Sequence, residues 1–255
     1  MTAPSLLLRH SPAIVGVASV IGLFAAIEGL IRASVINRHV VPLPSQVLLA
    51  FPRVIAEEDV LGRFLTTAGE AAAAALLLAA TAIPLGVLLH RTQLICTAVE
   101  GWIAAMAAAP LVLIYPLFLV IFGRNALTII MIGFAAGLAP VILKTLEGLR
   151  ATRPVLLNVG RSFRLSRAQQ FWKILLPSAL PSIFTGMRLG LIFALINVVG
   201  VEFLINFGGL GQLINDLAER YDLPAMYATI CFVILVSVVF FMGLEHLERW
   251  LRPRQ

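Results

Sequence analysis

Residues 158–177 read NVGRSFRLSRAQQFWKILLP and form a basic stretch inside a chain that is 60% hydrophobic. The stretch carries four Lys or Arg residues and no Asp or Glu. It is too polar to cross a bilayer, yet its apolar residues recur at helical spacing. A segment of this kind is a patterned connection between two more apolar parts of the chain.

The pattern around this stretch predicts a helix, a turn and a second helix. Pro154 suits the first turn of a helix, where its missing N–H costs nothing. Ser166 with Gln169 three residues later forms a capping-box pattern, which predicts the start of the second helix. Pro177 and Pro181 are expected to kink or end that helix. The first helix would carry its apolar residues on one side: Val155, Leu156, Val159 and Phe163.

Two roles remain open for a short helix that is held off the membrane by two longer ones. Its apolar ridge, surrounded by arginines, could dock into a partner protein. Alternatively, the basic side chains could rest on anionic lipid as a positive-inside anchor.

The composition indicates an all-α polytopic membrane protein, one transmembrane domain over residues 1–255. Only 13% of the residues are charged and the mean hydropathy is +0.98, whereas soluble domains carry about 25% charged residues. A span needs about 20 apolar residues to cross a hydrocarbon core about 30 Å thick. Six spans are predicted at residues 12–31, 64–89, 102–122, 126–145, 183–205 and 225–244.

Two shorter features are predicted around these spans. Pro110 and Pro116 fall within the third span and favour an interior, cavity-lining helix, with two tolerated kinks as the equal alternative. Ser45 is expected to cap a short amphipathic helix that lies along the membrane surface.

The distribution of charge predicts which side each end faces. With both termini in the cytoplasm, the inside connections hold 11 of the 19 basic residues, and the basic residues outside are matched by acids. The positive-inside bias therefore favours cytoplasmic termini and places residues 150–177 in the cytoplasm. The same bias explains the net charge of +6 without a nucleic-acid partner.

Ionisable residues inside the spans are costly and often functional. Glu28 and Glu70 are expected to reach the interface from near span ends, and Arg188 to anchor the cytoplasmic end of the fifth span or to pair locally. Glu202 precedes a turn at Gly208 and Gly209. It could guard the mouth of a translocation pathway or serve as a structural carboxylate bonded to a neighbouring span.

No arrangement of residues predicts catalysis, a metal site or a bound nucleotide. The four histidines form no H-E-x-x-H pair, and both cysteines are expected to be packing residues. Lys144 and Lys173 are the two lysines of the chain, and neither lies in a G-x-x-x-x-G-K-[ST] motif.

The basic stretch resembles the cytoplasmic EAA motif of permeases from binding-protein-dependent bacterial ABC importers, the group that includes nitrate, sulfonate and taurine permeases. That motif reads E-A-A, three residues, Gly, nine residues, I-x-L-P. Ile174, Leu176 and Pro177 match its end in register. Counting back places Asn158, Val159 and Gly160 at the E-A-A positions and Arg164 at the glycine, so the front half is degenerate.

Further segments resemble the same permeases in the same order along about 200 residues. They are LPSQVL at 43–48, APLVLIYPLFLVIFGRNA at 109–126, PVILKTLEGLR at 140–150, TGMRLGL at 185–191 and FGGLGQLI at 207–214.

The resemblance implies the six-helix type I importer permease fold in the bacterial inner membrane, and a transport subunit that is not an enzyme. It implies that the helix around 155–163, with Arg161 and Phe163, couples to a separate cytoplasmic ATPase dimer, which would bind the ATP and Mg²⁺. A second permease and an extracytoplasmic solute-binding protein are the other implied partners, and Pro110, Pro116, Glu202, Gly208 and Gly209 would lie along the pathway or its gate. The solute would be a nitrate-, sulfonate- or taurine-like anion or a small heterocycle. The alternative is a secondary transporter driven by an ion gradient, for which internal repeats and midplane acids are expected.

Overall fold

The computed structural model describes residues 6–38 and 40–251, and those residues form helices and connecting turns without a strand. Five helices are long and apolar enough to span a membrane, or six spans if one bent pair is counted as a span. The fold class is therefore as predicted. The long helices are α1 (Leu6–Arg32), α3 (Val60–Arg91), α6 (Ala126–Arg150), α9 (Leu176–Ile205) and α11 (Leu223–Leu251).

The third predicted span is broken rather than continuous. It consists of α4 (Gln93–Ala108), a 3₁₀ turn η1 (Leu111–Ile114) and α5 (Tyr115–Phe122), and the chain bends by 89° between α4 and the η1–α5 part. Steric contact with a proline ring disfavours the helical conformation at the residue before it. Ala109, which precedes Pro110, is accordingly extended, and α4 ends there. Pro116 lies in the first turn of α5, where a proline is tolerated. Both prolines are exposed in the single chain, and their place along a pathway stays a prediction.

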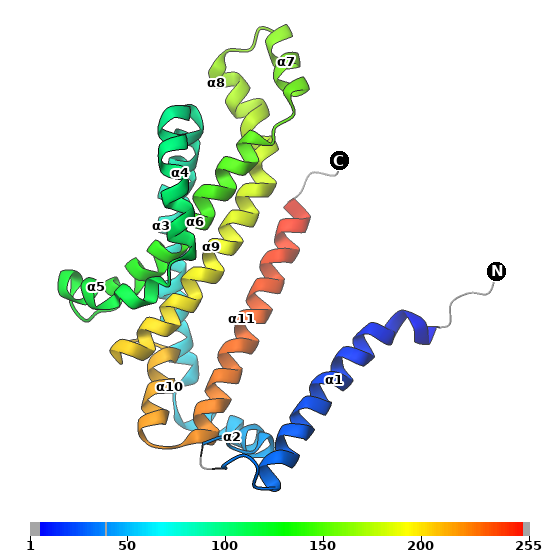
Figure 1. Ribbon diagram of the computed structural model, residues 1–255, viewed down its shortest axis with the longest axis vertical. Coiled ribbons are helices and arrows are strands. Elements are labelled where there is room, and N and C mark those ends of the chain that lie inside the picture. Colours follow the sequence, from blue (N-terminus) through cyan, green and yellow to red (C-terminus); the bar gives the residue numbers. More distant parts are fainter. Residues whose placement is uncertain (1–5, 39, 252–255) are drawn as a thin grey trace.

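The core is the crossing of α6 and α9, with α3 packed against both (Figure 1). A Cβ atom placed on Gly137 of α6 would lie 2.7 Å from the carbonyl oxygen of Gly190 on α9. The two backbones therefore touch, as at the small-residue interfaces that let membrane helices approach closely. Leu78 of α3 fills the adjacent space and is fully buried.

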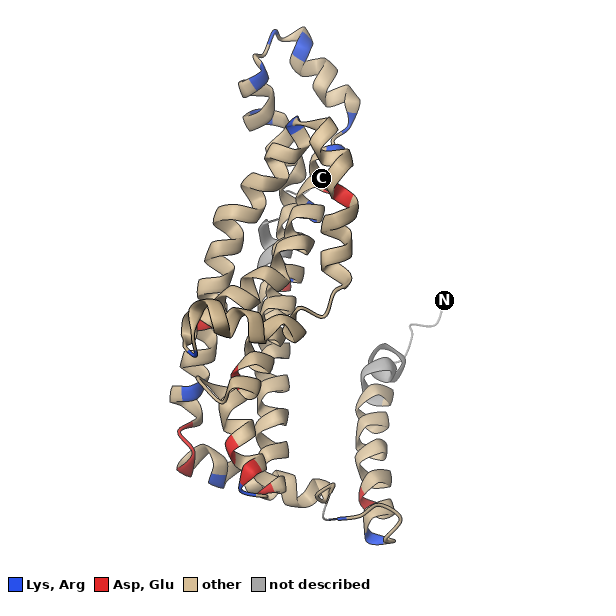
Figure 2. Cartoon of the chain, turned by 60° about the vertical axis from the view of Figure 1, so that its left-hand side comes forward, with Lys and Arg blue, Asp and Glu red and all other residues tan. Residues whose placement is uncertain are grey.

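The other helices lie around this core. In both views α1 stands apart from the bundle, and its apolar side chains from Val15 to Leu30 are largely exposed (Figures 1 and 2). The short helix predicted near Ser45 is α2 (Pro44–Glu57), which starts two residues earlier than expected, because Leu43 rather than Ser45 is the N-cap and Pro44 occupies the first turn. It buries Ala50 and Val54 in a cluster with α10 (Leu210–Glu219) and α11.

Charge separates the two ends of the molecule. Lys and Arg gather on the hairpin formed by α7 (Pro154–Ser162) and α8 (Arg167–Gln170), whereas the acidic residues of α2, α3 and α10 lie towards the opposite end among further arginines (Figure 2). We call these the basic end and the mixed-charge end.

Candidate functional site

The helix α7 presents an apolar ridge that no other part of the described chain covers. Pro154 forms its first turn, as predicted, and Phe163 follows its last residue as the C-cap. The ridge consists of Val155, Leu156, Val159 and Phe163, whose exposed fractions run from 42% to 77%.

A Schellman motif ends α7 and centres on Arg164. The N–H of Arg164 donates to the carbonyl of Arg161 (2.8 Å) and the N–H of Leu165 donates to that of Gly160 (3.0 Å). Arg164 lies in the left-handed region, with φ +54°, which is the conformation that glycine adopts most readily. The resemblance aligned Arg164 with the glycine of the EAA motif, and the backbone here has the conformation such a glycine would permit.

The second half of the hairpin begins at the predicted capping box. The amide of Gln169 donates to the Ser166 hydroxyl (3.2 Å), and the amide of Ser166 donates to the Gln169 side chain (2.9 Å). The second helix does not end at Pro177. Instead α8 continues through a π-helical turn η2 (Phe171–Leu175) into α9, and the Leu176 N–H donates to the Phe171 carbonyl. Pro177 then falls in the first turn of α9.

Gly160 brings the two arms of the hairpin together. It is buried, and a Cβ there would lie 2.7 Å from the Cδ1 atom of Ile174. Gly160 and Ile174, both predicted coupling residues, are therefore in contact, whereas Asn158 and Arg164 are exposed. Asn158 stays within its own helix, where its Oδ1 accepts from Arg161 Nη1 (3.4 Å).

The base of the hairpin is held by residues that the sequence reasoning missed. Arg150, at the end of α6, donates to both oxygens of Glu100 on α4 (2.8 and 3.0 Å) and to the Sγ of Cys96 (3.1 Å). The Arg91 guanidinium lies 4.9 Å from the centre of the Phe171 ring, a cation–π distance. The signal in the sequence that could have identified these contacts is the position of Arg91 and Arg150 at the ends of α3 and α6.

At the mixed-charge end, Glu202 lies among residues of three helices. Its side chain is completely buried and accepts from the Thr67 hydroxyl of α3 (2.8 Å) and from the Gly211 N–H of α10 (2.7 Å). Gly208 and Gly209 form the connection between α9 and α10 beside it, and a Cβ on Gly208 would lie 3.4 Å from Glu202 Cγ. The geometry is that of a carboxylate bonded to a neighbouring span, one of the two predicted roles.

Glu70 was expected to reach the membrane interface, but it is buried inside the bundle instead. It lies ten residues into α3, only 5% of it is exposed, and it faces the Glu202 cluster. Glu28, in contrast, lies one turn from the end of α1, pairs with Arg32 (2.5 Å) and accepts from Ser45 (3.2 Å).

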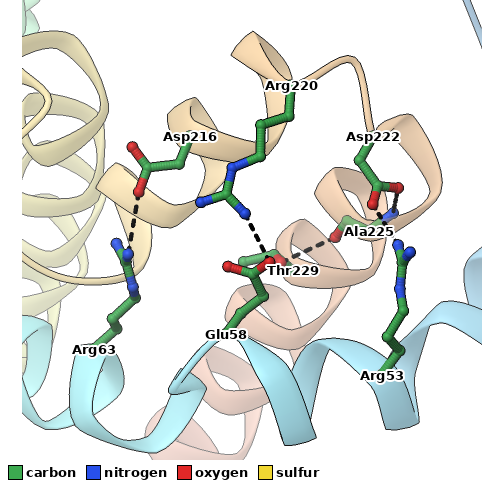
Figure 3. Close-up of polar contacts among 8 residues, drawn as sticks. All are labelled: Arg53, Glu58, Arg63, Asp216, Arg220, Asp222, Ala225 and Thr229. Carbon is green, nitrogen blue, oxygen red and sulfur yellow. Dashed lines mark hydrogen bonds and ion pairs between the residues drawn. The ribbon is translucent and has the colours of Figure 1, made fainter.

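Three ion pairs tie α2 and α3 to α10 and the start of α11 at the same end (Figure 3). Arg63 of α3 pairs with Asp216 of α10 at 3.1 Å. Figure 3 also shows Asp222, the residue before α11, accepting a hydrogen bond from the Ala225 amide in the first turn of that helix. The other two pairs are Arg53 with Asp222 and Arg220 with Glu58.

The predicted pathway residues are not all gathered in one place. The broken third span, with Pro110 and Pro116, flanks α9 through Val112, which lies next to Gly200. A groove of about 860 Å³ lies on α9 and α11. Its lining is mostly apolar, and Arg188, Ser237 and Glu245 are its polar members. Glu202, Gly208 and Gly209 lie outside this groove.

The described residues form a bundle of helices long and apolar enough to span a membrane, with a basic, partly apolar hairpin at one end. Residues 82–253 match the family of binding-protein-dependent transport system inner membrane components, and the chain belongs to that family. The match favours an importer permease over an ion-gradient-driven secondary transporter. It also makes the chain a multi-pass protein of the inner membrane.

Curated relatives and a solved structure agree with this family. The taurine transport system permease protein TauC of Escherichia coli K12 is 28% identical over 171 residues, which cover 67% of this chain and 62% of that protein. SsuC of Bacillus subtilis 168, named as an aliphatic sulfonates transport permease protein, is 27% identical over 91% of this chain and 83% of its own length. A chain of the inward-facing MetNI methionine ABC transporter has the same fold, with a TM-score of 0.65 at 18% identity, covering 76% of this chain and 96% of that one.

Proposed function

We propose that this chain is the permease subunit of an ATP-driven importer, with α7 as the element through which a cytoplasmic ATPase moves the spans. The observation that carries the proposal is the uncovered apolar ridge of α7 at the basic end. Large apolar side chains rimmed by polar residues mark protein interaction sites. A surface anchor on anionic lipid would account for the arginines of the hairpin, but the rigid Schellman and capping-box geometry supports a docking element.

The remaining parts of the importer follow from the family. A cytoplasmic ABC ATPase dimer would supply ATP and Mg²⁺, a second permease would complete the pathway, and an extracytoplasmic binding protein would deliver the solute. Both chain termini would lie in the cytoplasm, on the side of the basic end. The names of TauC and SsuC support a small sulfonate-type anion as the solute.

The coupling proposal is tested by placing a charge on the ridge. The variant Val159→Asp should abolish copurification of the P-loop ATPase with the tagged permease, because a carboxylate cannot be buried unpaired in an apolar groove. The matched control is Ile55→Asp, which adds the same charge to an exposed apolar position on α2 at the opposite end.

Taurine uptake into proteoliposomes that contain the whole transport system provides the functional measurement. Uptake should require ATP inside the vesicles, survive dissipation of ion gradients, and be lost in Val159→Asp but retained in Ile55→Asp. ATPase binding that is unaffected by Val159→Asp, or uptake that follows an ion gradient, would contradict the proposal.

A further inference from the structure

The buried cluster at the mixed-charge end contains two carboxyl groups and too few hydrogen-bond donors for both. Glu202, Glu70 and Thr67 are 0%, 5% and 3% exposed. The side chains of Glu70 and Glu202 both border the turn between α9 and α10. Gly208 lies against both, since a Cβ placed there would be 3.4 Å from Glu202 Cγ and 3.5 Å from Glu70 Oε1.

Among the described residues, the hydrogen-bond donors of this cluster serve Glu202 and Thr67, and none serves Glu70. The Gly211 N–H donates to Glu202 Oε2. Thr67 accepts from the Leu210 N–H (2.9 Å), and its hydroxyl donates over a shorter distance to Glu202 Oε1 (2.8 Å) than to the Arg63 carbonyl (3.3 Å). Glu202 therefore has the partners of an ionised carboxylate at the N-terminus of α10, where the helix dipole favours negative charge.

Glu70 has no such partners. No N–H or O–H group of the described residues donates to either of its buried oxygens. The charged groups that the surrounding elements direct to this end are used elsewhere: Arg63 pairs with Asp216, and Arg124 donates to the Asn206 carbonyl. An ionised Glu70 would place a second unpaired negative charge beside Glu202 in a low-dielectric interior, which is strongly unfavourable.

We propose that Glu70 and Glu202 form a proton-binding site, in which Glu70 is a neutral carboxylic acid that donates its O–H to the Glu202 carboxylate. The shared proton supplies the one donor that the cluster lacks and ties α3 to α9 beneath α10. Loss of this proton at alkaline pH leaves two adjacent anions, so the site stabilises the protein at lower pH and this stabilisation is lost as the pH rises. The proposal concerns the folded permease and does not depend on its solute or its ATPase.

A glutamine at each position separates the two roles. In Glu70→Gln the amide N–H can donate to Glu202 as the proton does, so the variant should fold and keep its melting temperature at neutral pH. In Glu202→Gln one of the carboxylate's acceptor oxygens is replaced by an amide N–H, so the melting temperature should fall. The control is Glu147→Gln, which removes an exposed carboxylate that pairs with Lys144.

The measurements use the full-length permease in lipid nanodiscs. The infrared carbonyl band of a protonated carboxylic acid should be present at neutral pH in the wild type and in Glu147→Gln, and absent in Glu70→Gln. The melting temperature of the wild type should fall between neutral and alkaline pH more steeply than that of Glu70→Gln.

Three outcomes would overturn the proposal. The first is an unchanged infrared band in Glu70→Gln, which would place the proton elsewhere. The second is a melting temperature that is lowered as much by Glu70→Gln as by Glu202→Gln. The third is wild-type stability that rises with Na⁺ relative to choline and does not depend on pH, which would identify a cation as the occupant of the site.

Discussion

Arg164 combines an unfavourable backbone conformation with an exposed position. A residue with a Cβ atom pays about 1–2 kcal/mol to adopt the left-handed conformation, and Arg164 has no hydrogen bond from its side chain that would offset this cost among the described contacts. The Schellman motif requires this conformation whatever the residue. The arginine is thus retained at a cost in local stability, and its guanidinium is available to a partner at the tip of the hairpin.

This cost predicts that Arg164→Gly stabilises the permease. Glycine adopts the left-handed conformation freely but loses more entropy on folding, so the net gain is expected to be about 0.5–1 kcal/mol. The measurement is the melting temperature of the purified permease, together with the rate of proteolysis within the hairpin.

The matched control is Arg161→Gly, which removes the same side chain three residues earlier, inside α7. It should destabilise the protein by about 1 kcal/mol, because glycine is a poor helix former. If both variants lower the melting temperature, the Arg164 side chain makes a contribution that outweighs its backbone strain.

At the scale of the helices, the crossing of α6 and α9 depends on the absence of side chains. Gly133 and Gly137 on α6, and Gly186 and Gly190 on α9, are each four residues apart and lie on the contacting faces. Because Gly137 touches the backbone of Gly190, no rotamer change can make room for an added methyl group there.

The variant Gly137→Ala is accordingly expected to destabilise the fold by about 1–3 kcal/mol, the usual cost of overpacking. Gly69→Ala is the control, since Gly69 also lies within a long helix but has open space around its Cβ position. Chemical denaturation in detergent micelles gives both free energies of unfolding. Equal effects of the two substitutions would show that close approach of the helices does not limit stability.

The sequence predicted these helices well where the signal was local. Hydropathy located the long spans, and Pro154 and the Ser166–Gln169 pair correctly predicted where α7 and α8 begin. The prolines were interpreted less well. Pro110 breaks a span that hydropathy alone makes continuous, whereas Pro177 does not end its helix, because the π-helical turn before it allows the chain to continue.

Predictions that depended on tertiary contacts were less successful. Glu70 was expected at the interface because nothing in its neighbourhood along the chain indicates that it is buried beside the turn at Gly208. The close crossing at Gly137 was missed, although two small-residue pairs at four-residue spacing, 133–137 and 186–190, were visible. A carboxylate's partners can be found only once the helices that carry them are placed.

At the scale of the whole molecule, the separation of charge defines two sides. The basic hairpin lies at one end, and the ion pairs of α2, α3 and α10 lie at the other (Figure 2). The positive-inside bias predicts that the basic end faces the cytoplasm.

Labelling with a membrane-impermeant maleimide tests this orientation. In a background without Cys96 and Cys231, a cysteine replacing the exposed Glu57 should react in intact spheroplasts. A cysteine replacing the exposed Phe163 should react only after permeabilisation. Labelling of the Phe163→Cys variant in sealed spheroplasts would reverse the assignment.

The continuous helix that leads from the hairpin to Glu202 has a mechanical consequence. The 30 residues of α9 span about 45 Å at 1.5 Å per residue, and the π-helical turn η2 joins this rod to the hairpin without a break in the helical backbone. A tilt of about 10° imposed on the rod at its basic end displaces its far end by about 8 Å if the rod stays straight. The carboxyl pair and the glycine turn are located at the end of the rod where that displacement would be largest.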